Sequence, residues 1–135
     1  MKYFLDTNTI IYAVKGKYPA IADHFARTHA QSIMVPSIVV AEIEYGAEKS
    51  SDYSRTIAVY NRFLNAFRNN IAEFSYSAAV EYGIIRAELE KAGTPIGPND
   101  LIIAAIVKAN DGILVTHNVG EFSRVRGLRI EDWTE

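Results

Sequence analysis

Three acidic residues stand at positions that structure alone does not readily explain: Asp6, Glu42 and Asp100. Carboxylates that converge without His or Cys form an all-oxygen site, which suits Mg²⁺ or Mn²⁺ better than zinc. Close carboxylates also repel one another, and a divalent cation neutralises them. Such an ion can activate water and stabilise the charge on a phosphate. Metal-assisted phosphodiester hydrolysis is therefore the chemistry that this residue set predicts.

Each acid also has a purely structural interpretation. Asp6 directly ends an apolar run and could form a turn or cap the next helix. Asp100 falls in the first turn of a predicted helix, where an acid favours the helix dipole. Glu42 has Val39 and Tyr45 three residues away on either side, so it interrupts an apolar helical stripe. An ionised carboxylate there costs free energy unless it is satisfied, which favours function. The alternative is a partly exposed Glu at the stripe's edge.

Short apolar runs alternate with helical patterns along the chain, which predicts an α/β fold. The runs at 3–5, 33–35 and 113–115 are typical of buried strands, and 71–74 and 128–130 are further candidates. A parallel sheet covered on both faces follows from this alternation. The predicted helices cover residues 10–16, 19–30, 37–49 with Ser37 as its N-cap, 54–69, 77–91 and 99–108.

Polar residues follow two of the predicted strands. Asp6 follows the first, and Thr116 and Asn118 follow the strand at 113–115. In open parallel sheets, ligands bind beyond the carboxyl ends of the strands. We therefore expect the functional site at that edge, although strand ends are also often polar for solubility alone.

The bulk properties limit the classes of protein. The 135 residues suit one domain, 1–135, and 49% hydrophobic residues can form a core. The absence of cysteine excludes disulfides and thiolate metal sites. Neither a signal peptide nor a membrane-length apolar run is evident, so we expect a cytoplasmic protein without a membrane partner. A net charge of -2 argues against a protein that only coats nucleic acid, but not against a nuclease.

Five blocks of the sequence resemble the VapC toxins, ribonucleases of the PIN-domain family that belong to type II toxin–antitoxin (VapBC) systems. The blocks occur in the family's order and span nearly the whole chain, and together they are more specific than any one alone. They are Phe4–Asn8, Ala41–Ser50, Ile96–Ala105, Leu114–Asn118 and Glu121–Trp133.

The resemblance implies a PIN domain, a three-layer α/β/α fold with a central parallel sheet of four to five short strands. It implies an endoribonuclease dependent on Mg²⁺ or Mn²⁺, with tRNA as the RNA substrate. It also implies a homodimer and a VapB-type antitoxin that blocks the site and, with the toxin, binds promoter DNA. Asp6, Glu42 and Asp100 match the core acidic positions of the family.

The resemblance also assigns polar neighbours to that site. Asn118 stands where many PIN domains carry a fourth acid, which puts occupancy of a second metal position in question. The other side chains that resemble the lining of such a site are Thr7, Asn8, Ser37 and Thr116.

Other interpretations remain open from the sequence. Arg86 either contacts RNA or belongs to a solvated helix face. His24, His29 and His117 lack metal-ligand spacing. One rival function is a catalytically inactive PIN-like module that binds antitoxin or RNA. Another is an Asp-based phosphotransfer domain, although that pattern requires a second Asp where this chain has Asn8.

Overall fold

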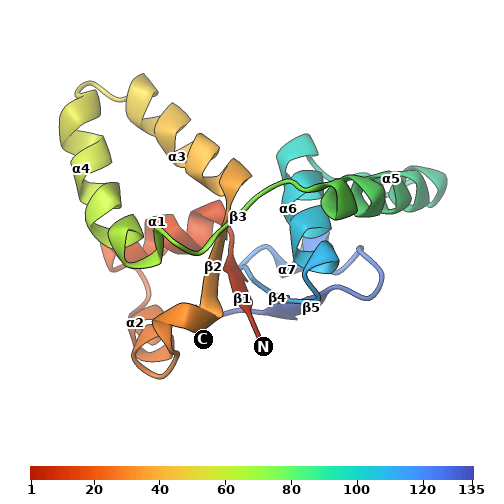
Figure 1. The fold of residues 1–135 in the computed structure, drawn as a ribbon, viewed down its shortest axis with the longest axis horizontal. Helices are drawn as coiled ribbons and strands as arrows, with labels where there is room; N and C mark the ends of the chain where they lie inside the picture. Colours follow the sequence, from red (N-terminus) through yellow and green to blue (C-terminus); the bar gives the residue numbers. More distant parts are fainter.

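A computed structural model describes residues 1–135, and its centre is a five-stranded parallel sheet (Figure 1). The strand order is β3-β2-β1-β4-β5, and every neighbouring pair is parallel. The predicted α/β fold with a parallel sheet is confirmed. The strands are β1 (Tyr3–Leu5), β2 (Ile33–Pro36), β3 (Ile71–Ala72), β4 (Ile113–Val115) and β5 (Arg129–Glu131).

Helices cover the sheet on both sides and make the three layers that we expected. In Figure 1, α1 to α4 lie to the left of the strands, and α5 to α7 lie to the right. None of these helices is long and apolar enough to cross a membrane. The helices are α1 (Thr7–Lys15), α2 (Pro19–Ala26), α3 (Ser37–Lys49), α4 (Tyr53–Leu64), α5 (Tyr76–Lys91), α6 (Pro98–Ala109) and α7 (Val119–Phe122), with 3₁₀ turns at Ala30–Ser32 and Asn65–Phe67.

Most of the predicted elements occur within a few residues of their predicted bounds, with two informative exceptions. The prediction that Ser37 caps α3 is wrong: Ser37 is already helical, and Pro36 takes the N-cap position without a side-chain hydrogen bond. Pro36 still pairs with Ala72 as the last residue of β2, so the helix begins directly after the strand. The short helix α7 was not predicted, because four residues are too few for an apolar period.

The order of the strands places β1 and β4 side by side although about 110 residues separate them in the sequence. Phe4 pairs with Leu114, and Leu5 with Val115. The chain moves from β1 through β2 to β3 on one side, and then crosses back to β4 on the other. Such a switch of direction opens a crevice at the carboxyl ends of the two central strands. Asp6 and Thr116 lie at this crevice.

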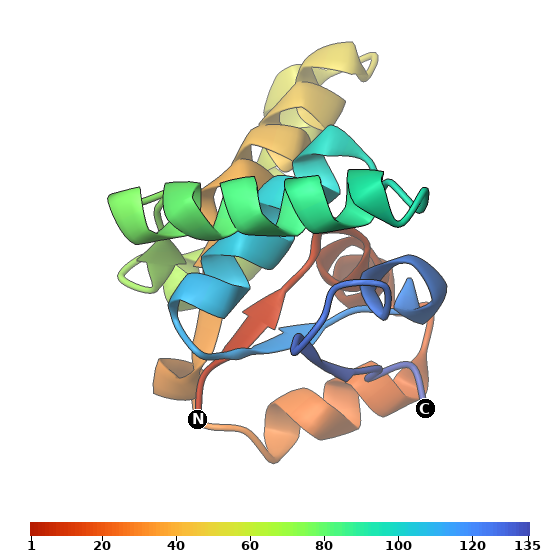
Figure 2. The ribbon, with the colours of Figure 1, turned by 90° about the vertical axis from the view of Figure 1, so that its right-hand side faces the viewer.

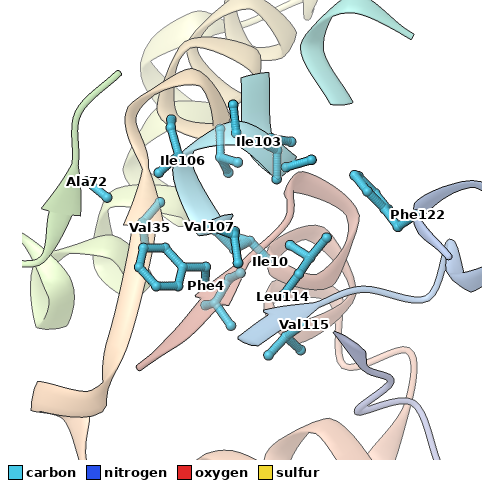
Figure 3. Close-up of a cluster of buried hydrophobic side chains, with 14 of the residues drawn as sticks. Phe4, Ile10, Val35, Ala72, Ile103, Ile106, Val107, Leu114, Val115 and Phe122 are labelled. Carbon is cyan, nitrogen blue, oxygen red and sulfur yellow. The ribbon is translucent and has the colours of Figure 1, made fainter. Parts of the chain in front are cut away.

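Helix α6 is the apolar centre of the fold. The sequence from Leu101 to Val107 is apolar without interruption, and Ile103 to Val107 are all nearly inaccessible to solvent. Figure 3 shows Ile103, Ile106 and Val107 gathered with side chains of the central strands, including Phe4 and Leu114. Burying an aliphatic side chain of this size contributes about 1.5–3 kcal/mol. The core therefore holds the first turn of α6, and Asp100 with it, firmly in place.

The C-terminal tail is fixed to the body by Trp133, which is 2% exposed. Its ring packs against Tyr3 and Phe25 and stacks on His24 with an interplanar angle of 3°. The tail returns past the sheet in Figure 2, close to the end of β4. This placement brings Asp132 within hydrogen-bonding distance of His117.

Gly112 lets β4 begin directly against the ring of Phe4. A Cβ atom at this position would overlap the Phe4 ring, which is 1% exposed, so the ring or the backbone would have to shift within the core. Overpacking of this kind costs about 1–3 kcal/mol. We expect Gly112→Ala to lower the free energy of unfolding by that amount in urea denaturation.

Gly46→Ala is the matched control for this substitution. Gly46 is exposed in α3 with no neighbouring atom within 4 Å of an added Cβ. Alanine is the better helix former, so this variant should be as stable as the parent or up to about 1 kcal/mol more stable. Equal stability of Gly112→Ala and the parent would contradict the proposed contact.

Candidate active site

A cavity lies at the carboxyl edge of the sheet, where the sequence predicted the site. Its walls come from the end of β1, the start of α1, and helices α3, α6 and α7, so residues far apart in sequence meet there. All three predicted acids are among the lining residues. The lining consists of Asp6, Thr7, Asn8, Glu42, Asp100, Ile103, Asn118 and Phe122.

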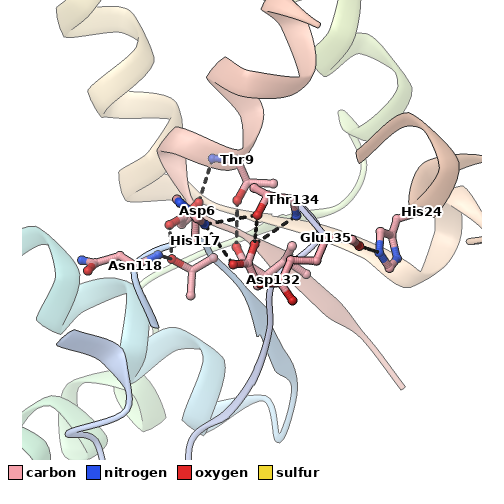
Figure 4. Close-up of polar contacts among 10 residues, drawn as sticks. Asp6, Thr9, His24, His117, Asn118, Asp132, Thr134 and Glu135 are labelled. Atoms are coloured by element: carbon pink, nitrogen blue, oxygen red, sulfur yellow. Dashed lines mark hydrogen bonds and ion pairs between the residues drawn. The ribbon is translucent and has the colours of Figure 1, made fainter. Parts of the chain in front are cut away.

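Asp6 both caps α1 and faces the cavity. Its Oδ1 accepts a hydrogen bond from the backbone N–H of Thr9 at 2.8 Å, and its Oδ2 accepts one from the Thr116 hydroxyl at 2.5 Å. The bond between Thr9 and Asp6 is drawn in Figure 4. Burial raises the pKa of Asp6, the bonds from Thr116 and Thr9 oppose that rise, and the charge of Glu42 adds to it. The capping and functional interpretations of Asp6 are therefore compatible.

Glu42 lies at the edge of the buried face of α3, as in the alternative interpretation. The buried stripe is Val39, Ile43 and Ala47, and Tyr45 is 63% exposed. The predicted apolar surroundings of Glu42 are thus only partly present. Its Oε1 accepts a hydrogen bond from the Thr7 hydroxyl at 2.7 Å. This contact turns the carboxylate toward the end of β1.

Asp100 is a half-buried acid with neither a hydrogen bond nor an ion pair. It makes no capping bond in α6, so the structural interpretation accounts for it only through the helix dipole. Desolvation raises the pKa of Asp100 to about 6, with further contributions from the charges of Glu121, Glu42 and Asp6. A carboxylate without a partner among other carboxylates is the feature that a bound cation would satisfy.

Glu121 is an acid of this site that the sequence analysis missed. Its charge contributes more to the raised pKa of Asp100 than that of Glu42 or Asp6 does. Its Oε2 accepts a hydrogen bond from the side-chain amide of Asn118 at 3.2 Å. The only signal in the sequence is the spacing of three residues between Asn118 and Glu121, which places both on one side of a helical turn.

The other predicted residues divide into those near the cavity and those away from it. Thr116 is fully buried. Its hydroxyl oxygen accepts a hydrogen bond from the backbone N–H of Asn118 at 3.0 Å, and the same hydroxyl donates to Asp6. Thr7 and Asn8 line the cavity. Ser37 does not: it lines a different hollow with residues of α4.

Arg86 also lies outside the acidic cavity. It pairs with Glu90 at 3.0 Å and donates a hydrogen bond to the Tyr82 hydroxyl at 3.1 Å. These residues line a neighbouring cleft together with Pro98 and Leu101, on the first turns of α6. Arg86 is therefore an ion-paired residue of an exposed helix face, close to the helix that carries Asp100.

The donor set of the acidic cavity fits a hard divalent cation. The polar groups that line it are carboxylates, hydroxyls and amides, and no Lys or Arg is among them. No acid of the site takes part in an ion pair. No three acidic or His side chains converge tightly enough here to coordinate one ion. Coordination of one ion by all three acids would therefore need their carboxylates to turn toward one another.

The sequence matches known proteins over nearly its whole length. A sequence model of the PIN domain matches residues 3–128. The tRNA(fMet)-specific endonuclease VapC of Salmonella typhimurium is 40% identical over 98% of both chains. Ribonuclease VapC2 of Haemophilus influenzae is 44% identical over 98% of both. The chain is thus a PIN-domain protein, and within that class it belongs to the VapC ribonucleases.

Solved structures agree with this assignment. The chain matches VapBC2 from Rickettsia felis, bound to a promoter DNA fragment, with a TM-score of 0.90 and 36% identity over 98% of this chain and 99% of that one. It matches DNA-bound VapBC from Salmonella typhimurium with a TM-score of 0.91 and 39% identity over 98% of both chains. The predicted PIN fold and the toxin–antitoxin endoribonuclease class are confirmed.

The raised pKa of Asp100 predicts how stability depends on pH in metal-free protein. Its pKa rises from 3.8 to about 6 on folding, so the folded protein binds more protons than the unfolded chain in that interval. Stability contributed by the protonated acid is therefore lost as pH rises from about 4 to about 6. Asp100→Asn removes this penalty. At pH 7.5 in EDTA it should be more stable than the parent by about 1 kcal/mol, after allowance for solvent screening.

Urea denaturation at pH 3.5 and pH 7.5 tests this. The advantage of Asp100→Asn should be largely lost at the lower pH, where most Asp100 carboxyl groups are protonated in both the folded and unfolded states. Asp23→Asn, on the exposed face of α2, serves as the control and should show no such dependence. An equal effect of Asp100→Asn at both pH values would contradict the expected titration.

Proposed function

We propose that this protein is a divalent-metal-dependent endoribonuclease toxin that cleaves tRNA and is inhibited by a VapB-type antitoxin. The observation that carries the proposal is the cavity in which Asp6, Glu42 and Asp100 meet without any basic residue. Such a cavity in a VapC-family chain supports Mg²⁺ or Mn²⁺ as the ion. The ion would be held by these three acids, with Asn118 and Glu121 beside them.

The chain's own residues would keep the ligands in position. When bound, the ion supplies a Lewis acid and a water of lowered pKa. Thr9 and Thr116 orient the two oxygens of Asp6, each of which retains a free lone pair. Thr7 orients Glu42 in the same way. The ring of Phe122, which is 1% exposed, closes one wall of the cavity against water.

The proposed RNA substrate and antitoxin rest on the relatives. Those from Salmonella typhimurium and Shigella flexneri are named tRNA(fMet)-specific endonucleases, which supports tRNA as the substrate here. The structural relatives are VapBC complexes on DNA, which supports a VapB-type partner and contact with promoter DNA only through that complex. Arg86 would contact an RNA phosphate with the guanidinium N–H groups that Glu90 and Tyr82 leave free.

Cleavage of total tRNA by the purified, antitoxin-free protein tests the nuclease. We expect discrete fragments with Mg²⁺ or Mn²⁺ and none with EDTA. Asp6→Asn and Asp100→Asn should each lower the rate by about 100-fold or more, because each removes a charge from the site that stabilises the transition state. Asp23→Asn should cleave as the parent does.

Two outcomes would contradict this proposal in different ways. Cleavage that persists in EDTA or in Asp100→Asn would exclude the acidic cavity as the active site. Tight tRNA binding without turnover by metal-bound protein would instead support the inactive PIN-like module.

The homodimer is a further part of this proposal, and we place its interface on α5. Tyr76, Val80 and Ile84 follow one another at four-residue intervals and are 87%, 49% and 48% exposed. A continuous exposed apolar stripe of this kind is typical of a protein interface. The second copy of the chain would cover it.

Light scattering coupled to size exclusion measures the oligomeric state directly. Ile84→Glu should convert a dimer to a monomer, because it places a charge in the apolar stripe. Val59→Glu, at an apolar residue of α4 that is 43% exposed, should remain dimeric. A dimeric Ile84→Glu protein would place the interface elsewhere.

A further inference from the structure

A group of aromatic and basic side chains lies beside the acidic cavity and belongs to none of the functions assigned above. Its members are Tyr12 on α1, Lys17 and Tyr18 just after α1, and His117 after β4. We call this group the aromatic platform. His117 directly precedes the cavity residue Asn118, so the platform and the cavity share one edge of the sheet.

The platform is one connected cluster. The rings of Tyr12 and Tyr18 lie 6.3 Å and 5.7 Å from the His117 ring, and 5.1 Å from each other. The ammonium of Lys17 lies 4.9 Å from the Tyr12 ring centre and 5.6 Å from that of Tyr18. A positive charge is thus held over aromatic rings without a carboxylate partner.

His117 is held at one edge and free at the other. Its Nδ1 lies 2.9 Å from Asp132 Oδ2, and a carboxylate accepts, so Nδ1 carries the hydrogen. Asp132 is itself fixed by the backbone N–H of Thr134 at 3.0 Å and its hydroxyl at 2.7 Å (Figure 4). The His117 side chain is 47% exposed, and its Nε2 has no partner. The tail thus holds an exposed ring in a fixed orientation.

We propose that the aromatic platform binds the nucleotide of the RNA strand next to the one at the acidic cavity. The base stacks on the His117 ring, and the backbone phosphate meets the Lys17 ammonium. This inference rests on the proposed ribonuclease function and adds to it the residues that position the substrate. Aromatic rings beside a cation are the combination that binds single-stranded nucleic acid.

The charge of the molecule supports RNA as the occupant. The net charge is -2, and the cavity itself is acidic, so a polyanion needs cations at the cavity's border to approach. Lys17 is free to supply one, because it is not neutralised by an ion pair. The His117 ring, whose side chain is 47% exposed, supplies the surface for a base, and every base has a π-face. Tyr12 and Tyr18 are more buried and support that ring from the side of the core.

Binding of fluorescein-labelled total tRNA, followed by fluorescence anisotropy, tests the platform. All variants are made in the Asp100→Asn protein with Mg²⁺ present, so that binding is measured without cleavage. His117→Ala should weaken binding by about tenfold, the loss expected for one stacked base. His117→Phe should restore most of the affinity, because the ring is kept while the bond to Asp132 is lost. This pair separates stacking from a role of His117 in fixing the tail.

Lys17→Gln tests the phosphate contact through its salt dependence. Removing one phosphate contact should reduce the slope of log Kd against log salt by about 0.7–0.9. Lys2→Gln is the matched control. Lys2 precedes β1, at the opposite end of the strand from the cavity, and its ammonium donates to the carbonyl of Gln31. This control should leave both the affinity and the slope unchanged.

The outcomes of these binding experiments distinguish failure of the platform proposal from failure of the nuclease proposal. If His117→Ala and Lys17→Gln bind tRNA as tightly as Asp100→Asn alone, the platform proposal is overturned and the nuclease proposal stands. If the parent protein neither cleaves nor binds tRNA in the presence of Mg²⁺, both are overturned. Thermal unfolding of each variant verifies that the fold is intact. If His117→Phe binds tRNA as weakly as His117→Ala, the loss of affinity arises from the lost bond to Asp132 in the tail, and stacking on the ring is excluded.

Discussion

A buried carboxylate at the end of β1 is the constraint on which the rest of the site depends. Asp6 is 5% exposed, and a charge in that environment is tolerated only when hydrogen bonds satisfy it. One of its partners, Thr9, comes from the helix that follows, and the other, Thr116, comes from the end of β4. The second bond exists only once β1 and β4 have paired. Pairing of β1 with β4 therefore also completes the hydrogen bonding of Asp6 at the acidic cavity.

The remaining acids are held together by the core, against their mutual repulsion. Asp100 stands beside Glu42 and Glu121 without a basic side chain paired to it. What keeps it there is the helix that it begins, whose apolar residues fill the space against the sheet. Free energy from apolar burial thus offsets a local electrostatic cost. Proteins commonly accept such a cost where function requires it.

The parts of this structure that depend on local sequence were predictable, and those that depend on the topology were not. The apolar run of β1 ends at Asp6, and α6 is apolar all round after Asp100, so both acids were visible as exceptions. Glu121 could not be recognised in this way, because α7 is too short to show an apolar period. The closeness of Glu121 to Asp100 also depends on the fold. The prediction that Ser37 is the N-cap of α3 was wrong for a related reason. Pairing of Pro36 with Ala72 keeps Pro36 in β2, so the helix begins one residue earlier than the N-cap preference of Ser37 indicates.

The separation of acids from bases is what the proposed binding of a cation and a polyanion on one small surface requires. If a Lys or Arg reached the cavity, it would pair with Asp100 and occupy the place of the ion. The nearby basic groups are instead held elsewhere. Arg86 pairs with Glu90, and the Lys17 ammonium lies over two tyrosine rings. An aromatic face stabilises a cation without neutralising it, so Lys17 keeps its charge for the proposed phosphate contact, and the acids stay unpaired for the proposed metal.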